Sequence, residues 1–475
     1  MRNLTLLTDF YQLTMMNTYM RSNTGGKRGI FDVFFRGKAE TSYSIAAGLE
    51  QVIEYIQGLK FTDGDIEYLK GLGAFDGEFL EALKSFKFTG DIYAVEEGTP
   101  IFPYEPILTV VAPIFEAQLV ETAILNIINH QTLIATKAAK INRVAAGKDV
   151  VEFGLRRAQG PDAGIYGTRA SVIGGCMSTS NVYAAKLFGI TPKGTHAHSF
   201  VMSFASEYEA FMKYAEMYPD KCLLLVDTYD TLRSGVPNAI KVFDYLKGIG
   251  KKPVGIRIDS GDLAYLSQKA REMLDAAGHT EATIFASGDI DENVIASLNT
   301  QNAKIDAYGI GTKLITGYDN PSLGGVYKLA GIIENGGIIP KMKISNTKEK
   351  LTNPGFKKIY RIYGKNGMAE ADLIALFDEE IDESKPLTIF DPELTWQKKT
   401  FTEYSVRTLT KKIMENGKPI YVSPKIYDIR SYSIKALAEF DDAYKRLQNP
   451  HIYKVDLSDK LYDLRKGLIS EYLNL

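Results

Sequence analysis

The stretch KPVGIRIDSGDLAYLSQKAREMLDAAG (252–278) begins with a short apolar run that ends in charged and small residues. A second run follows it, with apolar residues at helical spacing. This order predicts a strand, a turn and a helix, which together form one βα unit. Because successive βα units build parallel sheets, the stretch indicates an α/β fold.

The same pattern recurs on both sides of this stretch. Further strand-like runs are DVVEFGL (149–155), KCLLLVDTY (221–229), ATIFASGD (282–289) and DAYGIGTKL (306–314). Amphipathic stretches with helical spacing separate most of these runs. Ligands of parallel α/β folds bind beyond the carboxyl ends of the strands, so we expect the chemistry of this chain at those ends.

Three segments differ in texture and predict the domain organisation. Residues 1–135 mix helical and strand patterns, residues 136–334 carry the βα units, and residues 335–475 are richer in Lys, Tyr and Glu. We expect the last segment to pack back on the first.

The composition argues against several classes of protein. A net charge of −2 gives no basic excess for nucleic acid, and the two cysteines, Cys176 and Cys222, show no zinc-ligand spacing. So few cysteines fit a reducing compartment. The first residues lack the apolar core of a signal peptide, and the longest apolar runs are far shorter than the ~20 residues of a membrane span. We expect a cytoplasmic protein with neither a membrane nor a nucleic-acid partner.

The first candidate site is EFGLRRAQGPDAGIYGTRAS (152–171). It places Phe153, Arg156, Arg157 and Arg169 around a glycine-rich loop after a strand. Guanidinium groups pair with carboxylates or phosphates, and an aromatic ring stacks on flat ligands. Taken alone, the segment fits a buried strand phenylalanine with surface arginines equally well.

The segment GTHAHSF (194–200) carries two of the five histidines, His196 and His198. Histidine is the usual side chain for proton or phosphoryl transfer near neutral pH. On a strand the two imidazoles would share one face. A metal site is disfavoured because nearby ligands are lacking, whereas a structural pair of histidines stays open.

The segment GIRIDSGDL (255–263) alternates Arg257 and Asp259, so that both point to one side of a strand. A charge on a barrel strand needs a partner. Ser260 and Asp262 follow at the predicted start of a helix, where they cap it or leave free N–H groups for an anion.

Other strand ends carry acids or small residues. ASGDID (286–291) and YGIGTKLITG (308–317) form small-residue turns that let backbone N–H groups approach a phosphate. Asp227 and Asp230 follow another strand and are further candidates. Tyr11 lies in the first turn of a predicted helix; taken alone it suggests only a half-buried tyrosine.

Together, ten segments resemble nicotinate phosphoribosyltransferases. They are TDFYQLTM (8–15), FFRGKAE (34–40) with YSIAAGLE (43–50), FPYEPILTV (102–110), ETAILNIINHQTLIATKAAKI (121–141), EFGLRRAQ (152–159), GTHAHSF (194–200), VDTYDT (226–231), IRIDSGDL (256–263), ASGDID (286–291) and GIGTKLITG (309–317). Each is weak alone, but their order spans nearly the whole chain. The resemblance implies an irregular α/β barrel of the type II phosphoribosyltransferase kind, with an α+β domain built from the N-terminal region and the C-terminal segment.

The resemblance also implies roles for individual residues. His198 would be phosphorylated by ATP, and Asp259 would lie beside the ribose. The implied substrate-binding residues are Tyr11, Phe153, Arg156, Thr195, Arg257, Gly288, Asp289, Gly311 and Thr312.

These binding residues divide by the part of the substrate that they hold. Thr195 and Tyr11 would line the nicotinate pocket, and Phe153 would stack on the pyridine ring. Tyr11 would come from the neighbouring subunit, which implies a homodimer with shared active sites. The two arginines would hold substrate anions, and the four residues of the glycine turns would bind the ribose phosphate.

The implied reaction condenses nicotinate with 5-phosphoribosyl 1-diphosphate to nicotinate mononucleotide and diphosphate, in NAD biosynthesis. Mg²⁺ would neutralise the leaving diphosphate, and ATP hydrolysis would drive the condensation through the phosphohistidine, as in enzymes classed with ligases. The related nicotinamide enzyme carries an Asp in the loop after the glycine-rich segment, where it accepts a hydrogen bond from the amide. The comparable segment here, CMSTSNVY (176–183), contains no carboxylate, and its hydroxyl groups at Ser178, Thr179 and Ser180 favour nicotinate over nicotinamide.

Three alternatives stay open. One is a nicotinamide or quinolinate phosphoribosyltransferase, although quinolinate enzymes are much shorter. Another is a phosphate-binding barrel with aldolase or isomerase chemistry, for which Lys313 is the obvious strand-end lysine. The last is a non-catalytic binding protein that retains the pocket.

Overall fold

The computed structural model describes residues 2–22, 24, 26–37 and 42–473, so that residues 38–40 of the motif FFRGKAE lie outside the described residues. The chain divides into two compact units, Met1–Leu133 with Ser322–Leu475, and Ile134–Pro321. Residues 322–334, which the sequence grouped with the barrel, belong to the first unit. The reason is that strand β12 (Gly325–Glu334) pairs with strand β1 (Arg28–Phe35).

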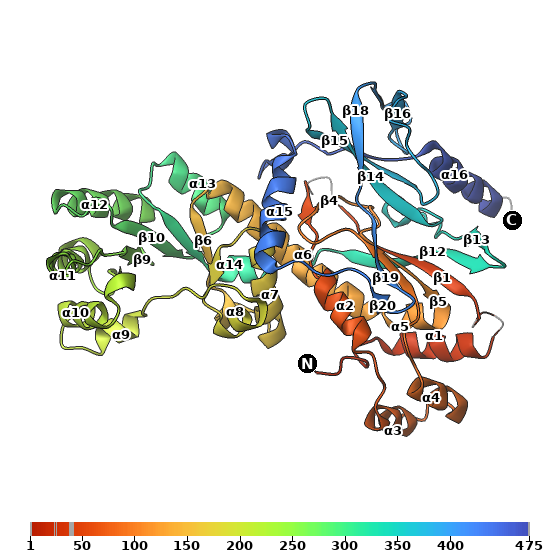
Figure 1. Ribbon diagram of the computed structural model, residues 1–475, viewed down its shortest axis with the longest axis horizontal. Helices are drawn as coiled ribbons and strands as arrows, with labels where there is room; N and C mark the ends of the chain where they lie inside the picture. Colours follow the sequence, from red (N-terminus) through yellow and green to blue (C-terminus); the bar gives the residue numbers. More distant parts are fainter. Residues whose placement is uncertain (1, 23, 25, 38–41, 474–475) are drawn as a thin grey trace. The chain divides into compact units, whose positions relative to one another are not determined.

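The first unit is built on a seven-stranded antiparallel sheet (Figure 1). Its strand order is β13 (Gly337–Pro340), β12, β1, β5 (Leu108–Pro113), β3 (Asp91–Ala94), β19 (Lys411–Glu415) and β20 (Lys418–Pro419). Strands β12 and β19 come from the later part of the chain and pair with β1 and β3. The N-terminal region and the C-terminal segment therefore share one sheet.

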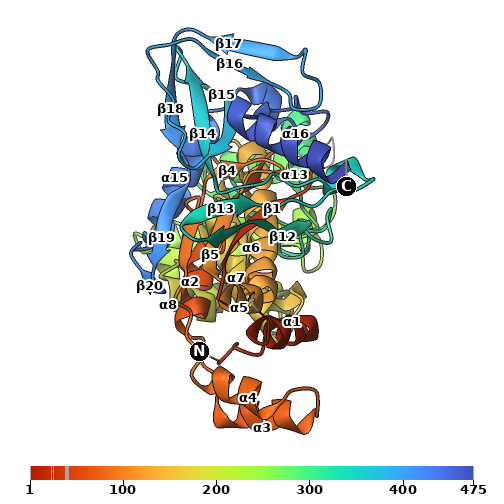
Figure 2. The same ribbon diagram turned by 90° about the vertical axis from the view of Figure 1, so that its right-hand side faces the viewer.

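A second, four-stranded sheet lies in the C-terminal segment. Its order is β18 (Tyr404–Thr408), β14 (Lys357–Gly364), β15 (Ala369–Leu376) and β21 (Val455–Leu457). Figure 2 shows the hairpin of β16 (Leu387–Phe390) and β17 (Lys398–Phe401) beside this sheet. Ile389 and Phe401 of the hairpin pack in one apolar cluster with Tyr360 and Leu373.

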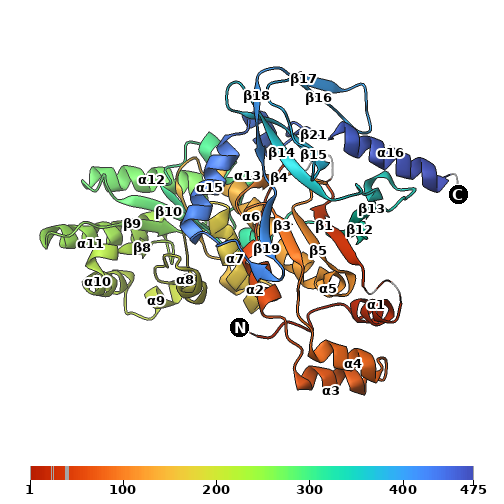
Figure 3. The same ribbon diagram turned by 45° about the vertical axis from the view of Figure 1, so that its right-hand side comes forward.

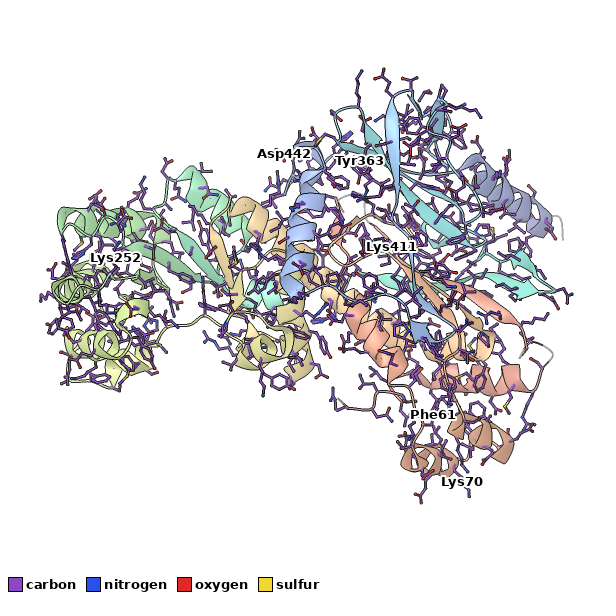
Figure 4. All side chains as sticks on the ribbon, in the orientation of Figure 1. Phe61, Lys70, Lys252, Tyr363, Lys411 and Asp442 are labelled. Carbon is purple, nitrogen blue, oxygen red and sulfur yellow. The ribbon has the colours of Figure 1, made fainter. Side chains whose placement is uncertain are left out.

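Two C-terminal helices are tied to this sheet. Tyr363, marked in Figure 4, donates its hydroxyl to Glu439 at 2.8 Å, directly after helix α15 (Ile426–Ala438). Leu461 of helix α16 (Asp459–Leu473), which Figure 3 shows beside the sheet, packs with Ile374 and Leu457.

The first unit contains further short elements. They are α1 (Phe10–Met20), β2 (Ser44–Ile45), α2 (Leu49–Gln57), α3 (Asp63–Gly71), α4 (Gly77–Lys84), β4 (Pro100–Ile101), α5 (Ile114–Leu119) and the first half of α6 (Glu121–Val144). The side chains of Phe79, Val110 and Ile124 are fully buried in one large apolar cluster between these elements and the sheet. This core stabilises the first unit without a disulfide, because both cysteines of the chain, Cys176 and Cys222, lie in the second unit and are free.

The second unit carries a six-stranded parallel sheet (Figure 1). Its strand order is β7 (Ser178–Thr179), β6 (Asp149–Glu152), β11 (Ala307–Ile310), β10 (Thr283–Gly288), β9 (Gly255–Ile258) and β8 (Leu223–Leu225). All neighbouring pairs are parallel. Among the described residues no ladder joins β7 to β8, so the barrel is irregular and open between its two edge strands.

Helices connect the parallel strands. They are α7 (Pro161–Ile173), α8 (Val182–Phe188), α9 (His198–Met202), α10 (Glu207–Met217), α11 (Val236–Gly248), α12 (Leu263–Ala276) and α13 (Glu292–Thr300), and the short helix α14 (Thr312–Ile315) follows the last strand, β11. Phe211, Phe243 and Leu274 from three of these helices are fully buried against Leu224 and Ile256 of the sheet. In the described part of the chain, no helix is both long enough and apolar enough to cross a membrane.

Candidate active site at the carboxyl ends of the parallel strands

The predicted site residues of the second unit follow neighbouring strands. Phe153 follows β6, Asp227 follows β8 and Asp259 follows β9, whereas Gly288 ends β10 and Gly311 follows β11. Because these strands are parallel, their carboxyl ends meet at one edge of the sheet. The fold thus gathers residues that are far apart along the chain.

Asp259 lies between an arginine and a histidine. Nη2 of Arg257 is 3.5 Å from its Oδ1, and Nε2 of His198 is 3.9 Å from its Oδ2. The hydroxyl of Ser287 also donates to Oδ1. One carboxylate therefore faces both groups for which the sequence predicts anion binding and phosphoryl transfer.

Arg257 is largely buried, with 14% of its side chain exposed. Its Nη1 donates to Oγ1 of Thr195 at 2.7 Å and to the backbone oxygen of His196 at 3.4 Å. Burial lowers the pKa of Arg257, while the carboxylates of Asp259 and Asp227 oppose this shift. The guanidinium therefore has the partners that a charge on a barrel strand needs, and it connects Thr195 to the strand end.

His198 is the first residue of α9, and 39% of its side chain is exposed. Its Nδ1 lies 3.2 Å from the hydroxyl oxygen of Thr228. This contact orients the ring so that Nε2 faces Asp259. Sequence reasoning did not single out Thr228, although a hydroxyl beside Asp227 at a strand end was a usable signal.

The expectation that His196 and His198 share a strand face is wrong. Residue 196 lies in irregular chain, so the alternation of a strand does not apply. His196 is buried against Phe200 and Tyr214, with ring centroids 5.2 and 4.9 Å away, and its Nε2 accepts from the backbone nitrogen of Leu225 at 3.3 Å. Burial lowers the pKa of His196 to about 4, so this imidazole is a neutral part of the core.

The two acids after β8 have different surroundings. Oδ2 of Asp227 accepts from the backbone nitrogen of Asp259 at 2.9 Å and from the hydroxyl of Ser260 at 2.6 Å. Asp230 accepts from backbone nitrogens of its own turn, those of Leu232 at 3.1 Å and Arg233 at 2.8 Å. Of the pair, Asp227 is therefore the one that contacts the end of β9.

Phe153 lies in an aromatic cluster above the sheet. Its ring centroid is 5.8 Å from that of Phe285. A Cβ atom at Gly309 would come within 2.5 Å of the Phe153 ring and 2.7 Å of the Phe285 ring. Only glycine fits between these rings, and Phe153 is half-buried, so part of its side chain stays accessible.

The glycine turns predicted to bind phosphate lie at the ends of β10 and β11. Gly288 has a φ of 117°, and a Cβ atom there would come within 2.6 Å of the backbone oxygen of Asp259. Asp289 is exposed, whereas Gly311 and Thr312 are half-buried at the start of α14. The structure therefore places Gly288 against the loop that carries Asp259.

Lys313 does not suit the aldolase alternative. Its Nζ forms an ion pair with Asp291 at 2.7 Å, and this hydrogen bond raises the pKa of Lys313. A Schiff-base lysine needs a lowered pKa to supply the neutral amine.

The three arginines of the glycine-rich segment differ in their exposure. Arg156 and Arg157 are exposed in a short 3-10 turn, Leu155–Arg157. The expectation that Arg169 lies on the loop is wrong, because it belongs to helix α7 and is 1% exposed. Its guanidinium carbon lies 5.9 Å from the centre of the Phe188 ring.

The acids of the site fit a magnesium ion that is bound together with substrate phosphates. No group of three or more His, Cys, Asp or Glu side chains suited to hold a metal occurs within the described residues. Mg²⁺ in phosphate sites, however, takes only one or two carboxylates and leaves the remaining positions to phosphate and water. Oδ1 of Asp227 is buried and has no hydrogen-bond partner among the described residues, so it is an unsatisfied oxygen in the side chain that contacts Asp259.

Sequence models of nicotinate phosphoribosyltransferases match three consecutive parts of the chain: the N-terminal domain over residues 6–129, the family domain over residues 149–352 and the C-terminal domain over residues 356–465. The chain belongs to the nicotinate phosphoribosyltransferase family. The nicotinate phosphoribosyltransferase of Bacillus subtilis (strain 168) is 48% identical over 473 residues, which cover 99% of this chain and 96% of that protein. The human nicotinate phosphoribosyltransferase is 31% identical over 524 residues, covering 98% and 96% of the two chains.

Solved structures agree with this membership. The crystal structure of human nicotinic acid phosphoribosyltransferase has a TM-score of 0.85 at 29% identity, and covers 98% of this chain and 100% of that one. A nicotinate-nucleotide pyrophosphorylase from Pyrococcus furiosus shares the fold, with a TM-score of 0.70 at 23% identity over 92% of this chain and 96% of that chain. The predicted irregular α/β barrel with an α+β domain is thus confirmed as the fold of this nicotinate phosphoribosyltransferase family member.

The segment 176–183 contains a contact that sequence reasoning missed. Thr179 donates its hydroxyl to the carboxylate of Glu152 at 2.6 Å, so a carboxylate lies beside the segment although none lies within it. The hydroxyl of Ser178 is buried and Ser180 is exposed. The signal in the sequence was a lone acid, Glu152, at the end of the apolar run that begins with Val150.

Tyr11, the remaining predicted residue, belongs to the first unit. It is 48% exposed on α1, and its hydroxyl donates to Glu121 at 3.3 Å. The role of Tyr11 in a shared nicotinate pocket of this family member stays a prediction.

Proposed function

We propose that this chain is a nicotinate phosphoribosyltransferase that joins nicotinate to 5-phosphoribosyl 1-diphosphate, and that it couples the reaction to ATP through a phosphohistidine at His198. The products are nicotinate mononucleotide and diphosphate, which places the enzyme in NAD biosynthesis. The observation that carries the proposal is the convergence of His198 and Arg257 on the two oxygens of Asp259. Membership of the family supports the same reaction.

The reaction breaks the bond between C1 of the ribose and the diphosphate oxygen, and the electron pair leaves with the diphosphate. The pyridine nitrogen of nicotinate then bonds to C1. Positive charge develops on the ribose in the transition state, so an acid beside it lowers the barrier. Asp259 suits this role because Arg257 and Ser287 hold its Oδ1, while Oδ2 faces the more exposed His198.

Nicotinate would stack on Phe153, whose ring is set by Gly309 and Phe285. Stacking orients the ring nitrogen and removes the entropy cost of bringing the two substrates together. Arg156 and Arg257 supply guanidinium groups for substrate anions, and Thr195 is held by Arg257 at 2.7 Å. The turns at Gly288 and Gly311 offer backbone N–H groups to the ribose phosphate.

Phosphorylation of His198 would transfer the γ-phosphoryl group of ATP to an imidazole nitrogen and release ADP. Nδ1 is engaged by Thr228 at 3.2 Å, so Nε2 is the nitrogen better placed to accept the group. The new negative charge beside Asp259 alters the affinity for the substrates. Water later attacks the phosphorus, and the release of phosphate restores the free imidazole, so that ATP hydrolysis drives the cycle.

Asp227 and Asp259 are the residues that would hold Mg²⁺, together with oxygens of the diphosphate. When bound, the ion supplies positive charge that stabilises the leaving diphosphate. Asp227 also has a structural role, since its Oδ2 accepts a hydrogen bond from the backbone nitrogen of Asp259 at 2.9 Å.

The decisive experiment incubates the purified chain with nicotinate, 5-phosphoribosyl 1-diphosphate, ATP and Mg²⁺, and follows nicotinate mononucleotide, diphosphate and ADP. We expect nicotinate together with 5-phosphoribosyl 1-diphosphate to stimulate ADP formation, and nicotinamide to be a poor replacement for nicotinate. The variant His198→Ala should keep its fold and lose the ADP signal. Full ATP coupling in that variant, or a preference for the amide, would contradict the proposal.

A further inference from the structure

Glu152, the last residue of β6, carries a fully buried carboxylate. It accepts hydrogen bonds from the backbone nitrogen of Gly154, from the hydroxyl of Thr168 at 2.9 Å and from the hydroxyl of Thr179 at 2.6 Å. The donors come from the loop after β6, from α7 and from β7. One side chain therefore connects three separate segments.

This carboxylate is costly to bury. Among the described residues no lysine or arginine forms an ion pair with Glu152, and burial raises its pKa while the three hydrogen bonds oppose the shift. A buried acid satisfied only by neutral donors adds less stability than an apolar side chain of similar size. A role beyond stability is therefore the better explanation of its presence.

One of the groups that Glu152 holds is next to the predicted stacking residue, Phe153. Gly154 follows Phe153 directly, so the bond to its backbone nitrogen closes the turn that presents the Phe153 ring. The backbone nitrogen of Phe153 donates a hydrogen bond to the backbone oxygen of Ile310 at 2.8 Å, which fixes the other side of the same turn. The direction of the ring is thus set from both neighbouring peptides.

The second end of the network lies in the segment 178–181. The hydroxyl of Thr179, which donates to Glu152, accepts from the backbone nitrogen of Asn181 at 2.9 Å. The backbone nitrogen of Ser180 donates to the backbone oxygen of Glu152 at 2.9 Å. The exposed hydroxyl-bearing residue Ser180 is therefore held on both sides by the same network.

We infer that Glu152 is a positioning residue that sets Phe153 and Ser180 relative to each other, and thereby shapes the recognition of the nicotinate ring. This inference rests on the proposed function and adds to it a residue that does not touch the substrate. Because the hydrogen bonds of Glu152 hold the segments that carry Phe153 and Ser180, its loss should weaken nicotinate binding more than binding of 5-phosphoribosyl 1-diphosphate.

The test compares steady-state constants of Glu152→Ala and Glu152→Gln with the wild type. Alanine removes all three contacts, so the KM for nicotinate should rise at least about tenfold, while the KM for 5-phosphoribosyl 1-diphosphate stays within about twofold. Glutamine keeps an oxygen for the nitrogen of Gly154 and offers its amide protons to the two threonine hydroxyls, which are able to accept. It should therefore restore most of the affinity for nicotinate.

Glu207→Ala is the matched control. Glu207 is also buried in the second unit, where it accepts from the hydroxyl of Ser234 and from Nδ2 of Asn238 at 3.1 Å. Its truncation removes a comparable buried acid, yet the KM for nicotinate should stay within about twofold of the wild type. Should Glu152→Ala fail to fold, Thr179→Val takes its place, because it removes the hydroxyl that donates to Glu152 and accepts from Asn181 at nearly constant volume, and it should raise the same KM severalfold.

The outcomes separate cleanly. A folded Glu152→Ala or Thr179→Val variant with unchanged nicotinate KM, or with equal rises in both KM values, overturns the inference while the wild-type activity stands. An inactive wild type overturns the proposed function itself, and the inference with it. A rise confined to nicotinate, with rescue by glutamine, supports the positioning role.

Discussion

The carboxylate of Asp227 accepts a hydrogen bond from the backbone nitrogen of Asp259 at 2.9 Å, which joins the ends of the neighbouring strands β8 and β9. A side chain on one strand end therefore sets the backbone that carries the central acid of the site. Asp259 owes its position to this contact as well as to Arg257 and Ser287.

Asp227→Ala should lower kcat by about two orders of magnitude, because even a small displacement of Asp259 misaligns the reacting groups. Asp230→Ala is the comparison, since this neighbouring acid bonds only within its own turn. Steady-state kinetics of both variants measure the effect. Equal losses of kcat in the two variants would show that the hydrogen bond between Asp227 and Asp259 does not contribute to catalysis.

Thr228→Val should slow phosphorylation of His198 by about fivefold, the value expected when one neutral hydrogen bond of about 1 kcal/mol is lost. The removed contact is the one between the hydroxyl of Thr228 and Nδ1 of His198, at 3.2 Å. Transfer of labelled γ-phosphate from ATP to the protein gives the rate. Thr228→Ser keeps the hydroxyl and should phosphorylate at the wild-type rate; slow transfer there would point to the lost methyl group instead.

Arg257→Lys should raise the KM for 5-phosphoribosyl 1-diphosphate about 10- to 100-fold, since a hydrogen bond to a charged group contributes about 1.5–3 kcal/mol. Lysine also loses the hydrogen bond that Nη1 of Arg257 donates to Oγ1 of Thr195 at 2.7 Å. Arg271→Lys is the matched control, because Arg271 binds the backbone oxygens of Ala282 and His279 instead. That control should lose thermal stability without a change in KM, and the opposite pattern would contradict the assignment.

Gly309→Ala should raise the KM for nicotinate and lower the melting temperature by a few degrees, because its Cβ atom would meet the rings of Phe153 and Phe285. Gly248→Ala, at the end of α11, has no atom within 4 Å of the added Cβ and should match the wild type. Kinetics and thermal unfolding of both variants test this. A wild-type nicotinate KM in Gly309→Ala would mean that the Phe153 ring does not contribute to binding.

The free energy of unfolding should fall as pH drops from about 6.5 towards 4, partly because of His196. Its pKa is lowered to about 4 in the folded chain and is ~6.5 in the unfolded one, so the unfolded state takes up the proton first. The contribution of one proton is at most ~1.4 kcal/mol per pH unit. Urea unfolding of wild type and His196→Gln across this range measures it; identical slopes would show that His196 does not titrate as argued.

The sequence was sufficient for the βα units and for the residues at their ends, because a parallel sheet brings successive carboxyl ends to one edge whatever the loops do. It was insufficient for contacts set by packing. Arg169 looked like a loop residue, yet α7 buries it. Glu152 looked like an ordinary strand-end acid, and its partners Thr168 and Thr179 are 16 and 27 positions away along the chain.

The same limit explains the boundary near residue 334 and the pair at 196 and 198. The pairing of β12 with β1 joins segments about three hundred positions apart, and local periodicity carries no information about such a partner. Likewise, the motif GTHAHSF shows two histidines at strand spacing, whereas in the folded chain a helix begins at His198.

The late arrival of β12 also has a consequence for biosynthesis. Phe35 pairs with Gly325, so an emerging nascent chain must grow by 290 positions before the open edge of β1 meets its partner. At ~5–20 residues per second on the ribosome, that edge waits for about 15–60 s. The barrel, Ile134–Pro321, is contiguous and is completed in the meantime. Chaperones that shield strand edges are therefore expected to engage this protein early in translation, when β1 is most prone to wrong pairing.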